Sequence, residues 1–242
     1  MAHISLTSLS AIEHEGALNA VKLSSVSTER RSPLDRARVA DTALRLLNEV
    51  GLDGLTLRAI AKELDVKAPA LYWHFKDKQA LLDEMATQMF RRMVAGTALD
   101  PADTWPERLL KINRGLRAAL LDYRDGARVF SGSLFTGTDH APALEENLRL
   151  LTAAGLTLAQ AVDAGRTVHA YTIGFVTEEQ GMRPLSGDQE ARTDIADRAR
   201  RMPDHPLAAA AGELLFHDYD RQFEEGLAVV IAGIGARYGV AS

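Results

Sequence analysis

Apolar residues recur at spacings of three and four along most of this chain, and no run alternates in the manner of a β-strand. The first such stretch carries Val39, Ala43, Leu46, Leu47 and Val50. These spacings place one apolar stripe on a helix, which a following glycine is suited to end. The same period returns over residues 105–123, 143–154, 159–179 and 212–238. The pattern predicts an all-α protein.

Three short helices are predicted near the start of the chain. Thr56 stands just before the apolar positions of the second helix and is a suitable N-cap. Asp65 and Val66 form a tight turn, and Pro69 lies in the first turn of the third helix, where its missing N–H is tolerated. A longer fourth helix follows and ends near Gly96. A tight turn between two short helices is typical of a helix-turn-helix, which lays its last helix in the DNA major groove.

Composition limits the chemistry that the chain can carry. Of its 242 residues, 46% are hydrophobic and 25% are charged, as expected for one large folded domain or two small ones. The absence of cysteine excludes thiol nucleophiles, disulfides and zinc sites built on thiolate. No apolar run is long enough to span a membrane, and the N-terminus lacks the pattern of a secretory signal. We therefore expect a cytoplasmic protein.

The net charge of −5 is unevenly distributed. Residues 34–80 carry eight basic and seven acidic side chains, whereas residues 81–242 carry seventeen and twenty-three. Any nucleic-acid interface must therefore be a local face in the first third of the chain.

One long stretch carries a resemblance to a known family. Residues 34–85, LDRARVADTALRLLNEVGLDGLTLRAIAKELDVKAPALYWHFKDKQALLDEM, resemble the DNA-binding domain of the tetracycline-repressor (TetR) family, including its G-L-T-L-R-x-I-A turn and L-Y-W-H-F-K-x-K recognition helix. The resemblance implies DNA binding, dimerisation through a four-helix bundle, and a helical C-terminal domain that couples DNA release to a small ligand. Residues 1–33 are rich in Ser and short of large apolar residues, so we expect a mobile extension there. The resemblance implies a helix-turn-helix domain over 34–80 and a ligand-binding and dimerisation domain over 81–242.

Candidate DNA contacts lie on the second and third helices. Arg58 has the planar fork that reads guanine bidentately, and Thr56 stands at a helix start, where phosphate binds. Small apolar surfaces suited to thymine methyls are provided by Ala68, Pro69 and Ala70. Beside them, Lys67 is the one long polar side chain that could reach a base edge. The DNA backbone would be held by Tyr72, His74 and Lys78. Tyr72 is as compatible with the core as with DNA. Trp73 is expected to be a core aromatic, because large aromatics dominate small cores.

The resemblance continues weakly beyond residue 100 into the tetracycline-binding class, with informative departures. Where that class holds its magnesium-bound drug with a histidine, this chain has Phe130, which cannot ligate a metal. The histidine and asparagine that meet the drug's polar edge correspond to Val94 and Ile112, and a family phenylalanine corresponds to Leu116. Leaving the ligand's polar groups unpaired costs about 1–3 kcal/mol each. We therefore expect a more hydrophobic effector than tetracycline, with no metal and no cofactor.

The candidate ligand pocket is mostly apolar with few polar groups, as small-molecule sites usually are. Its predicted members are Val94, Ile112, Leu116, Phe130, Leu134, Phe135, His169, Tyr171, Thr172, Phe175 and Glu178. The same residues are compatible with plain core packing. Phe135 and Phe175 fit either interpretation, His169 fits a satisfied core histidine, and Glu178 beside Glu179 fits a solvated face.

The last predicted helix is almost continuously apolar and combines small residues with β-branched ones. They are Gly226, Leu227, Ala228, Val229, Val230, Ile231, Ala232, Gly233, Ile234 and Gly235. Such a helix is expected to be buried on more than one side, as in a bundle shared between two subunits.

An enzyme is the main rival interpretation, but the sequence contains no G-x-S-x-G, H-E-x-x-H, P-loop or dinucleotide fingerprint. A helical protein-interaction module, or an activator without a small-molecule effector, is the other alternative. The residues favour a homodimeric repressor that binds a pseudo-palindromic operator on double-stranded DNA and is released by a small, largely hydrophobic effector.

Overall fold

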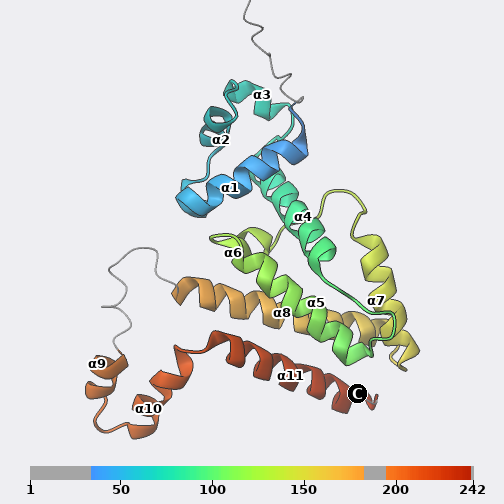
Figure 1. Cartoon of the computed structure of the whole chain (residues 1–242), viewed down its shortest axis with the longest axis vertical. Coiled ribbons are helices and arrows are strands. Elements are labelled where there is room, and N and C mark those ends of the chain that lie inside the picture. Colours follow the sequence, from blue (N-terminus) through green and yellow to red (C-terminus); the bar gives the residue numbers. More distant parts are fainter. Residues whose placement is uncertain (1–33, 183–194, 241–242) are drawn as a thin grey trace, which may run out of the picture. The chain divides into compact units, whose positions relative to one another are not determined.

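The computed structural model describes residues 34–182 and 195–240, and in these residues every regular element is a helix. The helices are α1 (Arg36–Gly54), α2 (Leu57–Glu63), α3 (Ala68–Tyr72), α4 (Lys78–Gly96), α5 (Trp105–Leu121), α6 (Gly126–Phe130), α7 (Ala141–Ala153), α8 (Leu158–Met182), α9 (Ile195–Arg200), α10 (Pro206–Leu215) and α11 (Tyr219–Tyr238) (Figure 1). The all-α prediction is confirmed. The expected extension over residues 1–33 lies outside the described residues.

The second and third helices begin at the residues that the sequence suggests, whereas the first continues past its predicted end at Gly51. The Thr56 side chain accepts a hydrogen bond of 3.1 Å from the backbone N–H of Ala59, which confirms its role as the N-cap of α2. Gly51 interrupts α1 with φ of 69°, and the helix resumes for a few residues instead of ending there. Leu71 and Phe75 are fully buried against α1 and α4, so the short helices share one apolar core.

α4 connects this three-helix unit to the remaining helices. It begins at its N-cap Asp77, whose carboxylate accepts a hydrogen bond of 2.8 Å from the Ala80 backbone N–H. Met85 and Met89 are buried, and the helix packs against α1 along one part of its length and α5 along another. α4 is therefore in contact with both the three-helix unit and α5.

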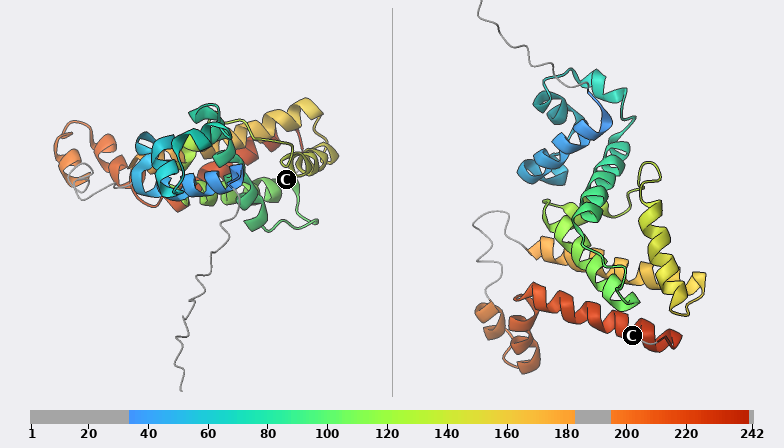
Figure 2. Two further views of the ribbon diagram at one scale, coloured as in Figure 1. Left: turned by 90° about the horizontal axis from the view of Figure 1, so that it is seen from above. Right: turned by 45° about the vertical axis from the view of Figure 1, so that its right-hand side comes forward.

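α5, α8 and α11 lie side by side (Figures 1 and 2). Between them a second apolar core forms around Trp105, Leu109, Val168, Phe223 and Leu227. A capping box starts α5, because the Glu107 carboxylate accepts a hydrogen bond of 2.8 Å from the Thr104 backbone N–H. α7 crosses the N-terminal half of α8 and also contacts α5.

Two parts of the fold differ from the sequence prediction. α6 was not expected; it follows Asp125, which has φ of 59°, and it requires Gly126, where a Cβ would lie 2.1 Å from the Leu120 carbonyl oxygen. The predicted helix over 212–238 is two helices, α10 and α11, because Asp218 adopts φ of 54° between them. The expected loop over 181–206 does contain one helical piece, α9, and its residues 183–194 lie outside the described residues.

Among the described helices, none combines the length and the apolar character that a membrane crossing requires.

Candidate functional site

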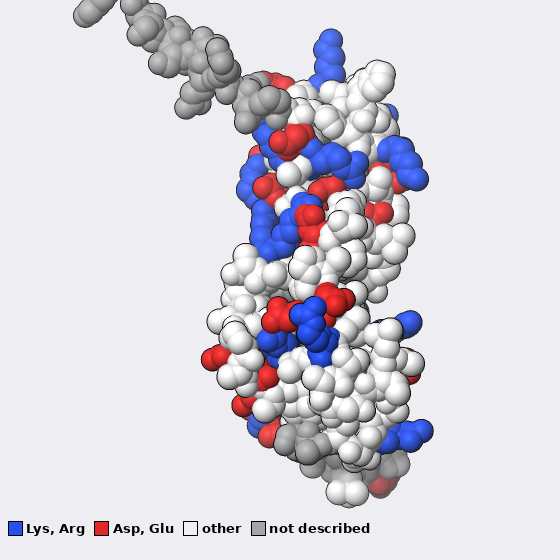
Figure 3. Space-filling view, turned by 90° about the vertical axis from the view of Figure 1, so that its right-hand side faces the viewer, with Lys and Arg blue, Asp and Glu red and all other residues white. Residues whose placement is uncertain are grey.

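α2 and α3 present most of the predicted DNA-binding residues to solvent. Arg58, Lys67, Pro69 and Lys78 are exposed, and Tyr72 is 56% exposed. Ala68, Ala70 and His74 are half-buried, and the exposed Thr56 uses its side chain to cap α2. In Figure 3, Lys and Arg side chains project from the upper part of the molecule, interspersed with carboxylates. The exposed Lys and Arg side chains on and beside α2 and α3 therefore lie on a surface that also carries carboxylates.

Trp73 corrects one expectation. Its side chain is 90% exposed, so the prediction that it is a core aromatic is wrong. The aromatic that fills the core is Phe75, two residues later, which is 0% exposed. Trp73 is the C-cap residue of α3, and Leu71 occupies the buried face beside it. A large aromatic ring is therefore exposed to solvent at the end of α3.

Lys78 lies at the start of α4 but also holds α1. Its Nζ donates a hydrogen bond of 3.0 Å to the carbonyl oxygen of Leu52, which follows the kink at Gly51. This contact anchors the end of α1 to α4.

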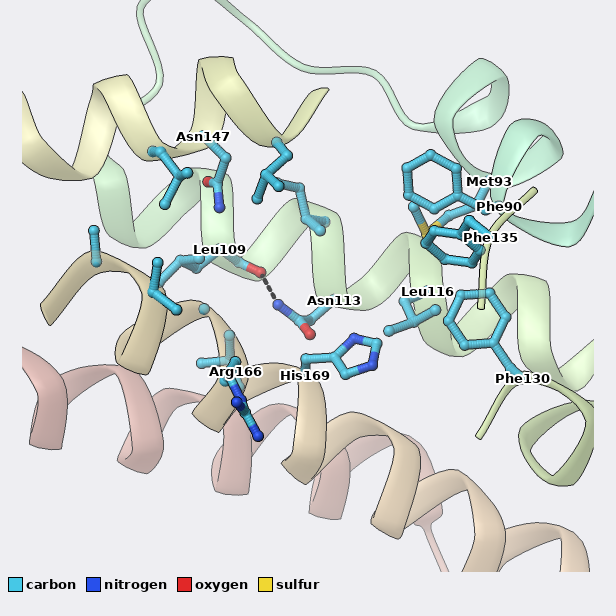
Figure 4. Close-up of a pocket in the computed structure, with 17 residues that line it drawn as sticks. Phe90, Met93, Leu109, Asn113, Leu116, Phe130, Phe135, Asn147, Arg166 and His169 are labelled. Atoms are coloured by element: carbon cyan, nitrogen blue, oxygen red, sulfur yellow. Dashed lines mark hydrogen bonds between the residues drawn. The ribbon is translucent and has the colours of Figure 1, made fainter. Parts of the chain in front are cut away.

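A largely apolar cavity of about 420 Å³ lies among α4, α5, α6, α7 and α8 (Figure 4). At one end Phe90, Phe130 and Phe135 pack together, with ring centroids 4.7 Å apart between Phe90 and Phe135 and 5.5 Å apart between Phe130 and Phe135. Leu109 of α5 and Asn147 of α7 lie toward the other end (Figure 4), and Leu148 of α7 also lines the cavity. The cavity thus has an aromatic end, and aliphatic side chains with a few polar ones line the rest of it.

Five of the predicted ligand-binding residues line this cavity: Ile112, Leu116, Phe130, Phe135 and His169. The structure does not bring the other six into it. Val94 is 42% exposed and follows Met93, which does line the cavity. Leu134 is 76% exposed and precedes Phe135. Glu178 is exposed and borders a separate hollow that also contacts Phe130, Phe135 and His169.

Tyr171 and Phe175 lie on a different face of α8 from the cavity. The Tyr171 hydroxyl donates a hydrogen bond of 3.1 Å to the Phe223 carbonyl oxygen, and the two rings stack with centroids 5.7 Å apart. Phe175 packs edge-on against Phe223, with centroids 5.4 Å apart. Both aromatics belong to the core between α8 and α11.

Thr172 acts behind the cavity wall. It is fully buried, and its Oγ1 lies 2.9 Å from Oδ1 of Asn113, which lines the cavity. The Asn113 Nδ2 donates a hydrogen bond of 2.8 Å to the Leu109 carbonyl oxygen (Figure 4). Thr172 therefore fixes the amide of Asn113, which the sequence analysis did not identify.

The cavity has few polar groups. Asn147 lies on α7, and its Oδ1 is buried with no hydrogen-bond partner among the described residues. His169 is accessible from the cavity, yet the surrounding protein lowers the pKa of its imidazole through desolvation. Arg166 lies one turn earlier on α8. A ligand here therefore meets a neutral ring and amides, with one cation beside them.

The side of the cavity that α8 forms follows the period of a helix. Val162, Gly165, Arg166 and His169 all line the cavity, at spacings of three and four. Of these four residues, only His169 was predicted from the sequence to contact a ligand. Extending the period backwards from His169 would have found the others.

α6 links the cavity wall to the end of α1. Its last residue, Phe130, lines the cavity, and Asp125 before its first residue accepts a hydrogen bond of 2.9 Å from the Leu52 backbone N–H. Arg128 lies 3.2 Å from the Asp53 carboxylate. On the other side, the Gln180 side chain accepts a hydrogen bond of 3.1 Å from the Ala127 backbone N–H. α6 therefore contacts both the end of α1 and the C-terminal part of α8.

In the described part of the chain, no three His, Asp or Glu residues cluster in a way that could hold a metal ion.

Comparisons with known proteins match both halves of the chain. Residues 39–85 match the family described as bacterial regulatory proteins, tetR family, and residues 97–238 match the domain described as tetracyclin repressor-like, C-terminal domain. The tetracycline repressor protein class A from transposon 1721 of Escherichia coli is 40% identical over 200 residues, which cover 82% of this chain and 89% of that repressor.

Two solved structures from Streptomyces coelicolor are also similar. One is a possible TetR family transcriptional regulator, with a TM-score of 0.72 and 38% identity, covering 84% of this chain and all of that one. The other is the TetR family protein ActR in complex with actinorhodin, with a TM-score of 0.73 and 26% identity, covering 87% of this chain and all of that one.

Proposed function

This chain belongs to the tetR family of bacterial regulatory proteins, and we propose that it is a ligand-responsive transcriptional repressor. A homodimer binds a pseudo-palindromic operator on double-stranded DNA, and a small, largely apolar effector releases it. The observation that carries this proposal is the connection between the cavity and the three-helix unit, since Phe130 and Asp125 at the two ends of α6 contact the cavity and α1 respectively.

The DNA-binding unit is formed by residues 34–80, with α3 as the recognition helix. Arg58 reads a base edge, Lys67 and the small residues 68–70 approach the major groove, and Tyr72, His74 and Lys78 hold the phosphate backbone. Trp73 makes a further contact of this helix with DNA, and its 90% exposure supports this assignment.

The effector binds in the cavity within residues 81–242. Its lining favours a compound with an aromatic ring system, which packs among Phe90, Phe130 and Phe135, and an aliphatic portion that lies toward Leu109 and Leu148. The phenyl ring of Phe130 cannot ligate a metal, so the effector binds without magnesium. The similar ActR structure is in complex with actinorhodin, and this supports a small-molecule effector here.

Dimerisation uses the outer face of α11. Leu227 and Ile231 are buried within the chain, whereas Val229 is 69% exposed and a Cβ added at Gly233 would meet no atom within 4 Å. An apolar face with small residues permits close approach of another helix. A second copy of the chain covers this face and sets the two α3 helices about one turn of DNA apart.

The effector acts by a shift in population. It must bind the state that cannot span two half-sites more tightly than the operator-bound state, and by reciprocity the operator must weaken effector binding by the same factor. Release of DNA needs no catalysis, so we propose that the protein is not an enzyme. A regulator that binds the chromosome acts in the cytoplasm.

Reciprocal binding tests this proposal. The fluorescent apolar compound N-phenyl-1-naphthylamine is titrated into the full chain alone and into the chain bound to a duplex selected for tight binding. We expect a weaker affinity for the compound in the presence of DNA, by about 5- to 150-fold. Equal affinities would remove the claim that the cavity controls DNA binding.

A further inference from the structure

The loop between α6 and α7, residues 131–140, connects the cavity to α4; we name it the effector loop. Phe135 of this loop lines the cavity and packs against Phe90. The next residue, Thr136, contacts α4: its backbone N–H donates a hydrogen bond of 2.8 Å to Thr87 Oγ1, and its hydroxyl donates one of 3.0 Å to Glu84 Oε2. One residue of the effector loop thus contacts the cavity, and the next one is hydrogen-bonded to α4.

Glu84 is a carboxylate held inside the protein. Its side chain is 6% exposed, and its oxygens lie 2.9 Å from Arg36 Nε and 3.6 Å from Arg91 Nη1. Because its charge is largely desolvated, this carboxylate depends on the groups that donate to it. Its position therefore responds to a change in the effector loop.

Arg36 carries this connection to the recognition helix. Its Nη1 donates a hydrogen bond of 2.6 Å to the carbonyl oxygen of His74, and its guanidinium lies over the Phe75 ring, 4.5 Å from the centroid. Both residues directly follow Tyr72 and Trp73 at the C-terminal end of α3. Arg36 thus fixes the segment that presents the proposed phosphate contacts.

We propose that Glu84 and Arg36 are positioning residues through which the effector loop sets the orientation of α3. An effector that packs among the aromatic rings displaces Phe135, Thr136 moves with it, and Glu84 loses a hydrogen bond. Arg36 then holds His74 less firmly, and the end of α3 leaves its DNA-binding position. This proposal rests on the proposed function and specifies how an effector in the cavity changes the position of α3. It is separate from the contact of α6 with the end of α1, because it reaches α3 through different residues.

The variant Thr136→Val isolates this route. Valine keeps the shape of threonine and the backbone hydrogen bond to Thr87, but it removes the hydroxyl that bonds to Glu84 and lies 3.3 Å from Thr87 Oγ1. Thr152→Val is the matched control, because the Thr152 hydroxyl bonds only to carbonyl oxygens within α7. Each full-length variant is titrated with N-phenyl-1-naphthylamine, with and without the selected operator duplex.

In the native protein and in Thr152→Val, the operator is expected to weaken probe binding by about 5- to 150-fold. The ratio compared is probe affinity without operator to probe affinity with it. In Thr136→Val this ratio falls toward one, because the hydrogen bond that the effector breaks is already absent. For the same reason, operator affinity without probe falls toward that of the probe-bound native protein, while probe affinity without DNA stays unchanged. A merely structural role of Thr136 would instead lower operator affinity and leave the ratio at its native value.

Glu84→Gln provides a second variant with nearly the same shape and no charge. Its ratio also falls, and combining it with Thr136→Val causes no further fall, because both changes act on one connection. A Thr136→Val ratio equal to the native ratio would overturn the proposal. If the operator did not change probe affinity in the native protein, the ligand response itself would be absent, and with it the function on which the inference rests.

Discussion

Arg117 and Glu179 form a bidentate ion pair between α5 and α8, and both hydrogen bonds are 3.0 Å long. The Glu179 side chain is 2% exposed and that of Arg117 is 12% exposed. Arg117 also lies 2.7 Å from the Asp220 carboxylate of α11. One guanidinium therefore ties together the three helices that enclose the second core, and Glu179 is not part of a solvated face.

Replacing Glu179 by alanine is expected to lower the free energy of unfolding by about 3–5 kcal/mol, because it leaves the Arg117 cation without its main partner. Its exposed neighbour supplies the control, since Glu178→Ala should change stability by no more than about 0.5 kcal/mol. Urea denaturation at one fixed protein concentration measures both, as stability depends on concentration in a dimer. Similar losses for the two variants would contradict the assignment.

Two aromatic residues of the α3 region should respond in opposite ways. Phe75→Ala empties a core position and should cost about 3–5 kcal/mol of stability. Trp73→Ala, at a position that is 90% exposed, should leave stability within about 0.5 kcal/mol of the native value but weaken operator binding. Thermal or urea unfolding and a DNA titration separate the two effects. Unchanged operator affinity in Trp73→Ala would show that this ring does not contact DNA.

Arg58 and Lys78 should affect DNA binding differently. Arg58→Ala should reduce discrimination between the operator and random duplex, because a bidentate base contact is worth about 1–3 kcal/mol. Lys78→Ala should weaken binding to both duplexes alike and lower the salt slope by about one. Titrations of both duplexes at several salt concentrations measure these quantities. Identical behaviour of the variants would mean that the assigned roles are wrong.

His169 should make stability depend on pH. Burial lowers the pKa of its imidazole in the folded state. As the pH falls below the ordinary histidine value of about 6.5, the unfolded chain therefore binds a proton before the folded one does, and stability decreases. His169→Gln should lose less stability than the native protein between about pH 7.5 and about pH 5.5. The exposed His205→Gln should match the native loss, and a native-like loss in His169→Gln would refute the assignment.

Local sequence signals predicted the three-helix unit well. Thr56, Pro69 and the apolar spacing of α1 and α2 act through neighbouring residues, so they can be interpreted without tertiary structure. Trp73 was misjudged because nothing local shows which side of a helix as short as α3 faces the core. α6 was missed because a five-residue helix has no full apolar period, and its start depends on the left-handed backbone of Asp125.

The candidate cavity was predicted in part. Ile112, Leu116, Phe130, Phe135 and His169 came from the family resemblance or from apolar character, and they do line one cavity. Tyr171 and Phe175 were misplaced because the helical period of α8 was not applied to them. Asn147 of α7 could not be predicted, since the pairing of distant helices does not appear in a single sequence.

The central claim is that this chain is a dimeric, operator-specific regulator. Selection of preferred sites from a pool of randomised duplexes, followed by titration of the winning duplex at two salt concentrations, tests it most directly. We predict enrichment of a two-fold symmetric site that binds two chains. Salt-sensitive binding without enrichment of any sequence would contradict the claim.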